Sequence, residues 1–124
     1  MSFLVDTNII IYHFNGDDTA SAFLEKESGN YAISFVTFVE LLSFPNLTDD
    51  LSEQIRSFLV GLEVIMADNQ IMENCIKNRK QKKIKLADNI IISTAQMRQM
   101  TLVTRNTDDF KGLDVAIMNP FEIV

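Results

Sequence analysis

Short apolar runs alternate with longer amphipathic segments along this chain of 124 residues. The runs predict buried strands over residues 3–5, 31–33, 64–66, 101–104 and 115–118. The segments between them repeat apolar positions at helical spacing and predict helices over residues 9–14, 18–27, 34–44, 48–61 and 86–100, with another that starts at Asp68. Because alternating strands and helices are typical of a parallel sheet covered on both faces, we expect one α/β domain over residues 1–124.

Polar residues and a proline mark the ends of several predicted helices. Ser34 or Thr37 can cap the helix that follows the second strand. Pro45 ends that helix, because proline disfavours helical backbone in the residue before it. Asp68 caps a later helix, and the predicted apolar face of that helix consists of Ile71, Met72, Cys75 and Ile76.

Charge is unevenly distributed along the chain. The net charge of −6 argues against a protein that holds nucleic acid by bulk electrostatic attraction. Even so, six of the 11 basic residues fall within one short segment and are expected in the C-terminal half of the Asp68 helix: Lys77, Arg79, Lys80, Lys82, Lys83 and Lys85. The segment is either a solvated helix face or a contact for an anionic partner.

The single cysteine and histidine exclude several classes of site. Cys75 has no partner for an internal disulfide, and we expect it to be a small hydrophobic residue of the core. A catalytic thiol would need a base, and His13, the only histidine, is expected at the surface or packed. No apolar run approaches the roughly 18 residues of a membrane span and no signal-peptide pattern opens the chain, so we expect a cytoplasmic protein.

Acidic residues stand at four places where a strand or an apolar helix does not need one. Asp6 follows the first strand, Glu40 lies within an apolar helix, Asp88 opens the last long helix, and Asp109 follows the fourth strand beside Asp108. In open α/β sheets, ligands bind beyond the carboxyl ends of the strands. Each acid also has an ordinary explanation, as a helix cap, as the partner of a basic residue or as a solvated loop charge.

Glu40 is the hardest of these acids to explain without a ligand. It is the only charged residue of its helix, so we expect it to be buried with no basic residue within a helical turn. Carboxylates about 4 Å apart repel by roughly 4 kcal/mol at an effective dielectric constant near 20, so a cluster needs a counterion. Hard cations such as Mg²⁺ prefer oxygen ligands, activate water and polarise phosphoryl oxygens. The acids therefore predict a carboxylate metal site for phosphodiester chemistry.

Four segments resemble, in order, the motifs of PIN-domain nucleases, and in particular the VapC-type toxins of bacterial toxin–antitoxin pairs. They are Val5–Ile9, Ser34–Leu41, Leu86–Ile91 and Val103–Phe110. The resemblance implies a three-layer α/β/α PIN-like fold with a central parallel sheet of four to five strands. It also implies a Mg²⁺- or Mn²⁺-dependent endoribonuclease that cleaves structured or single-stranded-loop RNA with a metal-activated water.

The resemblance also implies roles for individual residues. Asp6, Glu40 and Asp88 match acids that bind one or two metal ions in the family. At the fourth position, the choice lies between Asp109, its neighbour Asp108 and Asn106, which stands where many PIN domains have an acid; we assign Asp109 a supporting catalytic role. Residues expected to orient these groups are Thr7, Asn8, Thr37, Thr104 and Asn106. Candidates for RNA contact are Lys82, Lys83, Lys85 and Arg105.

A VapC-type toxin would form a homodimer and bind a small antitoxin protein. Other functions stay open at this point. A PIN-like DNA or flap nuclease, or a ribosomal-RNA processing factor, would use the same acids. A non-catalytic PIN domain or a receiver-like domain would instead bind a partner at an acidic pocket. A receiver domain, however, needs two adjacent acids at its first strand, where this chain has Asp6 alone.

Overall fold

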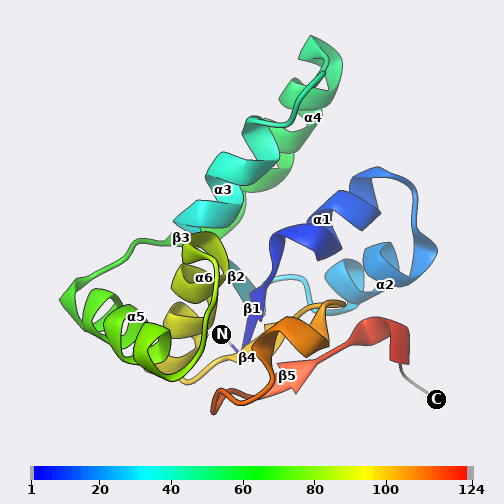
Figure 1. The fold of residues 1–124 in the computed structure, drawn as a ribbon. Coiled ribbons are helices and arrows are strands. Elements are labelled where there is room, and N and C mark those ends of the chain that lie inside the picture. The colour runs from blue at the N-terminus through cyan, green and yellow to red at the C-terminus, as the bar shows by residue number, and fades with distance from the viewer. Residues whose placement is uncertain (1, 123–124) are drawn as a thin grey trace.

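A sheet of five parallel strands runs through residues 2–122, the part of the chain that the computed structural model describes (Figure 1). The strands are β1 (Phe3–Val5), β2 (Tyr31–Ser34), β3 (Glu63–Ile65), β4 (Thr101–Val103) and β5 (Ile117–Met118). They lie in the order β3-β2-β1-β4-β5, so β1 is the central strand. The predicted α/β class and parallel sheet are confirmed, and the sheet has five strands.

Six α-helices connect and cover the strands. They are α1 (Thr7–Phe14), α2 (Asp18–Lys26), α3 (Phe35–Leu42), α4 (Asp49–Val60), α5 (Asn69–Gln81) and α6 (Leu86–Met97). Two short 3-10 helices follow β4 and β5: η1 (Thr107–Phe110) and η2 (Pro120–Glu122). No helix among residues 2–122 is long and apolar enough to cross a membrane.

The core is divided between the two faces of the sheet. Successive strand residues point to opposite faces, so Leu4 of β1 packs with the α6 residues Ile91 and Ile92, whereas Val5 packs with Ile9 and other residues of the α1, α2 and α4 side. Figure 1 shows α5 and α6 on one side of the sheet, with α1 and α2 on the other. The parallel sheet covered on both faces, which the alternating pattern predicted, is confirmed, and so is the three-layer α/β/α arrangement that the family resemblance implied.

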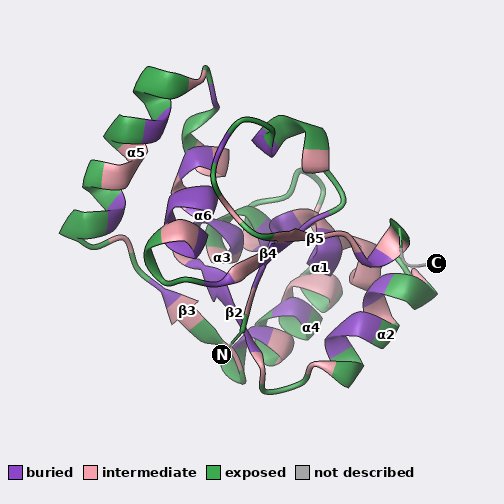
Figure 2. Cartoon of the chain, turned by 90° about the horizontal axis from the view of Figure 1, so that it is seen from below, coloured by how far each residue is buried: buried purple, intermediate pink, exposed green. Residues whose placement is uncertain are grey.

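The predicted apolar face of α5 is wrong. Of its four residues only Ile71 is buried, whereas Met72 and Ile76 are 50% and 52% exposed. The side of α5 that faces α6 carries Ile71, Cys75 and the buried Asn78, which are spaced as on one face of a helix. The prediction considered apolar residues alone and therefore missed the polar Asn78. Figure 2 shows how much of α5 faces solvent.

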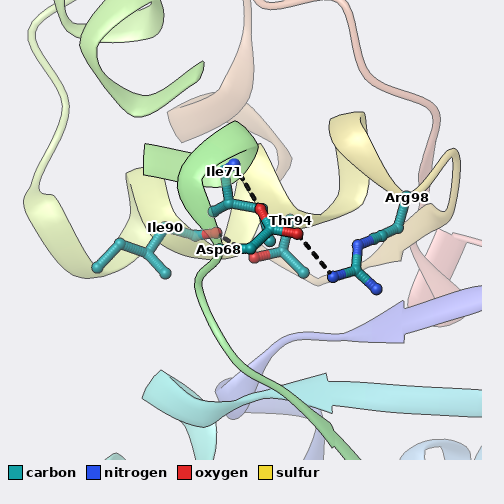
Figure 3. Close-up of polar contacts among 5 residues, drawn as sticks. All are labelled: Asp68, Ile71, Ile90, Thr94 and Arg98. Carbon is teal, nitrogen blue, oxygen red and sulfur yellow. Dashed lines mark hydrogen bonds and ion pairs between the residues drawn. The ribbon is translucent and has the colours of Figure 1, made fainter. Parts of the chain in front are cut away.

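The ends of α5 and α6 are joined by an acid that caps one helix and pairs with the other (Figure 3). Asp68 accepts a hydrogen bond from the Ile71 N–H at 2.9 Å, which confirms the predicted cap. Its other carboxylate oxygen accepts from the Arg98 guanidinium at 3.0 Å. The Ile71 N–H and the Arg98 guanidinium lower the pKa of Asp68. Because both side chains are exposed to solvent, the ion pair adds little to the stability of the fold.

A group of neutral polar side chains, here called the amide cluster, joins the middle of α5 to α6; three of its four members are buried and Gln96 is half-buried. The cluster consists of Asn78, Asn89, Ser93 and Gln96. The Asn78 side-chain amide donates to Gln96 Oε1 at 2.8 Å and to Ser93 Oγ at 3.0 Å, and the Ser93 hydroxyl donates to Asn89 Oδ1 at 3.1 Å. Asn89 in turn donates to the backbone carbonyl of α5 at Cys75, 2.9 Å away. Because Asn89 directly follows Asp88, the cluster holds the first turn of α6 in place.

Candidate active site

Asp6 is a buried acid at the carboxyl end of β1, where the chain turns into α1. Its Oδ1 accepts from the Thr7 N–H and its Oδ2 from the Thr104 hydroxyl, both at 2.8 Å. Burial raises the pKa of Asp6 to about 6, against the two hydrogen bonds, which lower it; the charges of Asp88 and Glu40 raise it further. Asp6 is therefore the N-cap of α1 and also interacts electrostatically with Asp88 and Glu40, the other two predicted metal ligands.

Glu40 is exposed, so the expectation that it is buried is wrong. It lies in the last turns of the short helix α3, where Val39 is exposed as well. Its Oε1 accepts a 2.6 Å hydrogen bond from the Thr7 hydroxyl, and Thr7 Oγ1 is 2.9 Å from Thr37 Oγ1. Since one hydroxyl has one proton, Thr37 must donate to Thr7 while Thr7 donates to Glu40. Thr37 therefore acts on Glu40 only through Thr7.

Asp88 lies in the first turn of α6 and is half-buried. The N-cap position belongs to Lys85, which makes no side-chain capping bond, so Asp88 is not a helix cap. Burial raises the pKa of Asp88, the charges of Asp109 and Glu40 raise it further, and the Lys85 ammonium lowers it. The positive end of the α6 dipole favours an anion in this turn.

At the fourth position the structure separates the three candidates. Asp108 forms an exposed ion pair with Lys111 at 2.8 Å. The Asn106 side-chain amide donates to Asp109 Oδ2, and the Asn106 N–H donates to Thr104 Oγ1 at 3.1 Å. Asp109 is the member of this group whose charge acts on Asp88. Thr104, through its bonds to Asp6 and Asn106, links the first and fourth motifs.

The acids lack basic partners and suit a hard cation. Among residues 2–122 the ion pairs are Arg98–Asp68 and Lys111–Asp108, so Asp6, Glu40, Asp88 and Asp109 have none. In the same residues no three acid, histidine or cysteine side chains converge closely enough to enclose a metal ion. Mg²⁺ is held through one or two carboxylates and keeps several waters, so an open set of oxygen donors fits it.

Asn8 adds a second observation that fits a bound group. Its side-chain N–H lies 3.5 Å from Thr104 Oγ1, the outer limit of a hydrogen bond. Its Oδ1 is buried and has no hydrogen-bond partner within the described part of the chain. A buried acceptor without a donor is costly, and a metal-bound water or a substrate hydroxyl could supply the missing donor.

The predicted lysines lie beside Asp88, in the loop between α5 and α6 rather than in a helix, because α5 ends at Gln81. This loop and η1 enclose a hollow of about 320 Å³. It is lined by Lys82, Lys83, Ile84, Lys85, Asp88, Asp108 and Asp109. Lys82 donates to the Lys111 carbonyl at 2.6 Å, which ties the loop to the end of η1. The hollow thus combines cationic and anionic walls.

Arg105, the fourth candidate for RNA contact, does not line this hollow. Its guanidinium lies over the rings of Tyr12 and Phe121. Neither aromatic residue was singled out from the sequence. A signal was present for Tyr12, which lies four residues after Asn8 and so on the same face of α1. His13, by contrast, packs against Phe14 and Phe58 and bonds to Ser21, away from the acids.

Comparison with known proteins identifies the fold. Residues 3–116 match the family model of the PIN domain. The chain belongs to the PIN-domain family. Members of this family are typically metal-dependent nucleases, and the match overturns the receiver-like alternative. No curated protein matches the chain.

Solved structures extend this PIN domain's resemblance to VapC toxins. A toxin–antitoxin complex from Klebsiella pneumoniae matches with 35% identity and a TM-score of 0.86, over 98% of this chain and 100% of that one. VapBC2 from Rickettsia felis, bound to a promoter DNA fragment, matches with 27% identity and a TM-score of 0.82, over 96% and 98%. FitAcB from Neisseria gonorrhoeae, at 24% identity, shares the fold, with a TM-score of 0.85 over 98% and 99%.

Proposed function

We propose that this PIN domain, spanning the whole chain, is a Mg²⁺- or Mn²⁺-dependent endoribonuclease and the toxin of a VapBC-type pair in the cytoplasm. The observation that carries the proposal is the placement of Asp6, Glu40 and Asp88. Asp6 lies at the end of β1, Glu40 in α3 and Asp88 in α6. In addition to burial, the charges of Asp88 and Glu40 raise the pKa of Asp6, and the charge of Glu40 raises that of Asp88. None of the three has an ion-pair partner among residues 2–122.

Asp6, Glu40 and Asp88 would hold the metal, with one or two of them bound directly and the remainder through its waters. When bound, the ion would activate a water and stabilise charge on the scissile phosphate. Thr104 and the Thr7 N–H fix the two oxygens of Asp6, while the Thr7 hydroxyl fixes one oxygen of Glu40. Thr7 therefore sets the positions of two acids at once.

Residues around the acids would handle the RNA and the attacking water. Asp109, oriented by Asn106 and close enough for its charge to act on Asp88, can accept a proton from water. Lys82, Lys83 and Lys85 line the hollow beside Asp88 and would hold RNA phosphates there. These cations offset the repulsion that a protein of net charge −6 exerts on RNA.

The proposed partners are a small antitoxin protein and a second copy of this chain. The Klebsiella pneumoniae relative was solved as a toxin–antitoxin complex, and its match covers nearly all of both chains. This supports the antitoxin partner. The homodimer rests on the sequence resemblance alone.

The proposal is tested by cleavage assays on the purified protein with Mg²⁺ and structured RNA. The Asp6→Asn variant should lose at least about a hundredfold in rate, since a ligand oxygen loses its charge. Asp18→Asn, an exposed acid at the start of α2, is the matched control and should cleave like the wild type. Equal cleavage rates for the wild type and Asp6→Asn would refute the proposed metal-dependent mechanism. Preference for DNA or flap substrates would favour the alternative nucleases.

A further inference from the structure

A cation rests on two aromatic rings beside the acids. The Arg105 guanidinium carbon lies 5.1 Å from the ring centroid of Tyr12 in α1 and 4.3 Å from that of Phe121 in η2. The two rings are themselves in contact, with centroids 5.3 Å apart and planes inclined by 58°. Together, Tyr12, Arg105 and Phe121 form what is here called the Arg105 platform.

Backbone and side-chain bonds fix the platform. The Thr104 N–H donates to the Met118 carbonyl at 3.0 Å, which holds the start of the Arg105 loop against β5. The Asn119 side chain accepts from the Phe121 N–H at 3.0 Å and donates to the Arg105 carbonyl at 3.5 Å. These bonds fix the backbone on either side of the guanidinium, which then lies over one ring from α1 and one from η2.

The platform begins where the acid site ends. Arg105 directly follows Thr104, whose hydroxyl donates to Asp6. Tyr12 lies four residues after Asn8, one helical turn or about 6 Å along α1, and Asn8 also contacts Thr104. If the scissile phosphate of an RNA strand lies at Asp6, the next one or two nucleotides of that strand would lie over the Arg105 platform.

The charge of Arg105 has no counterpart within the described chain. Arg105 is exposed, and neither ion pair among residues 2–122 includes it. Fastening η2 to α1 would need only an apolar side chain, yet the position carries a planar cation with five donors. A rigid plane with free donors suits a ligand that is both flat and anionic.

We propose that the Arg105 platform stacks an unpaired base of the RNA next to the scissile phosphate, while the guanidinium donates to a neighbouring phosphate. The inference rests on the proposed ribonuclease function and names its substrate as RNA that is unpaired at the cleavage site. Bases of single-stranded RNA stack on aromatic rings and on arginine planes, and such stacking tolerates any sequence.

The test uses short single-stranded RNAs in which 2-aminopurine replaces one base at a time. They are bound, with Mg²⁺, to the Asp6→Asn protein so that the RNA is held and not cut. Stacking quenches 2-aminopurine fluorescence, and we expect quenching at one or two positions. Adding Arg105→Met should abolish this quenching and weaken affinity about tenfold. Adding Arg105→Lys, which keeps the charge without the plane, should also abolish quenching but weaken affinity less.

Arg56→Met is the matched control, because it removes the same charge from an exposed site on α4. It should retain full quenching and affinity. Melting temperatures of the variants show whether Arg105→Met is folded, and Arg105→Lys carries the comparison if it is not. Quenching that persists in both Arg105 variants, or an affinity loss equal to that of Arg56→Met, overturns the platform.

The outcomes separate the platform from the proposed function. If wild-type protein cuts RNA and Arg105 variants stack it equally well, only the platform fails. If RNA stacks in an Arg105-dependent way but wild-type protein does not cut it, the platform stands and the ribonuclease proposal fails. RNA that neither stacks nor is cut overturns both.

Discussion

Two buried polar groups flank α6, and they are built in opposite ways. In the amide cluster every bond joins neutral partners, and Asn78 and Asn89 each reach a partner on the other helix. Around Asp6 the bonds instead end on carboxylates. Burial raises the pKa of Asp6, the charges of Asp88 and Glu40 raise it further, and Asn8 Oδ1 has no donor within residues 2–122. Within residues 2–122 the first group pairs its own donors and acceptors, whereas the second leaves acids without basic partners and one buried acceptor without a donor.

The contrast shows how the same elements serve stability and chemistry. Asp88 and Asn89 are adjacent at the start of α6, yet Asn89 faces α5 and Asp88 faces the acids. The hydrogen bonds of Asn89 to α5 hold the first turn of α6 in place, although the charges of Asp109 and Glu40 repel Asp88 in the same turn.

Asn78→Leu should lower the free energy of unfolding by roughly 2–4 kcal/mol, because Ser93 and Asn89 lose a buried donor and Gln96 keeps only its donor from Asn74. Urea denaturation measures the change. Asn69→Leu, at an exposed position of the same helix, is the control and should change the stability little. A loss no greater than that of the control would mean that the amide cluster does not hold α5 to α6.

Asp6→Asn should stabilise the metal-free protein at pH 7 by about 1–3 kcal/mol, since the pKa of Asp6 is raised from 3.8 to about 6. The folded protein binds the proton more tightly than the unfolded chain does. The contribution of protonated Asp6 to the free energy of unfolding is therefore fully present below about pH 4 and is lost as the pH rises through 6.

The difference between wild type and Asp6→Asn should accordingly vanish near pH 4. Thermal unfolding in a chelator across this range measures it. Mg²⁺ should then stabilise the wild type at pH 7 and leave Asp6→Asn nearly unchanged. A variant less stable than the wild type at pH 7 would show that Asp6 is satisfied without a cation.

Thr104→Val should lower the cleavage rate by roughly tenfold and move the acid limb of the pH–rate profile to higher pH. The Thr104 hydroxyl lowers the pKa of Asp6, so its removal raises that pKa further, and ionised Asp6 then requires a higher pH. Thr101→Val, at the start of the same strand, should leave the profile in place. A reduced rate with an unmoved profile would assign Thr104 a packing role only.

Local patterns made much of the fold predictable. The strand over residues 3–5 is found as predicted, and Asp68 caps its helix as predicted, because period and capping depend on neighbours in sequence. The long helix ends at Met97 rather than at 100, because Gln99 adopts a positive φ of 55° and the Met100 N–H returns to Ala95. Helix ends of this kind depend on packing.

The pattern of apolar and polar residues shows that Asp6 and Asp109 follow strands and that Asp88 opens a helix. It does not give the order of the strands, β3-β2-β1-β4-β5, which makes β1 and β4 neighbours in the sheet. How the elements pack places Glu40 in solvent and joins it to Asp6 through Thr7. Packing also brings Asp109 rather than Asp108 close to Asp88 and Arg105 against two aromatic rings. Each of these depends on side chains separated by many residues, such as Thr104 and Asp6. A periodic pattern states which face a residue takes, but partners across elements are set by how the elements pack.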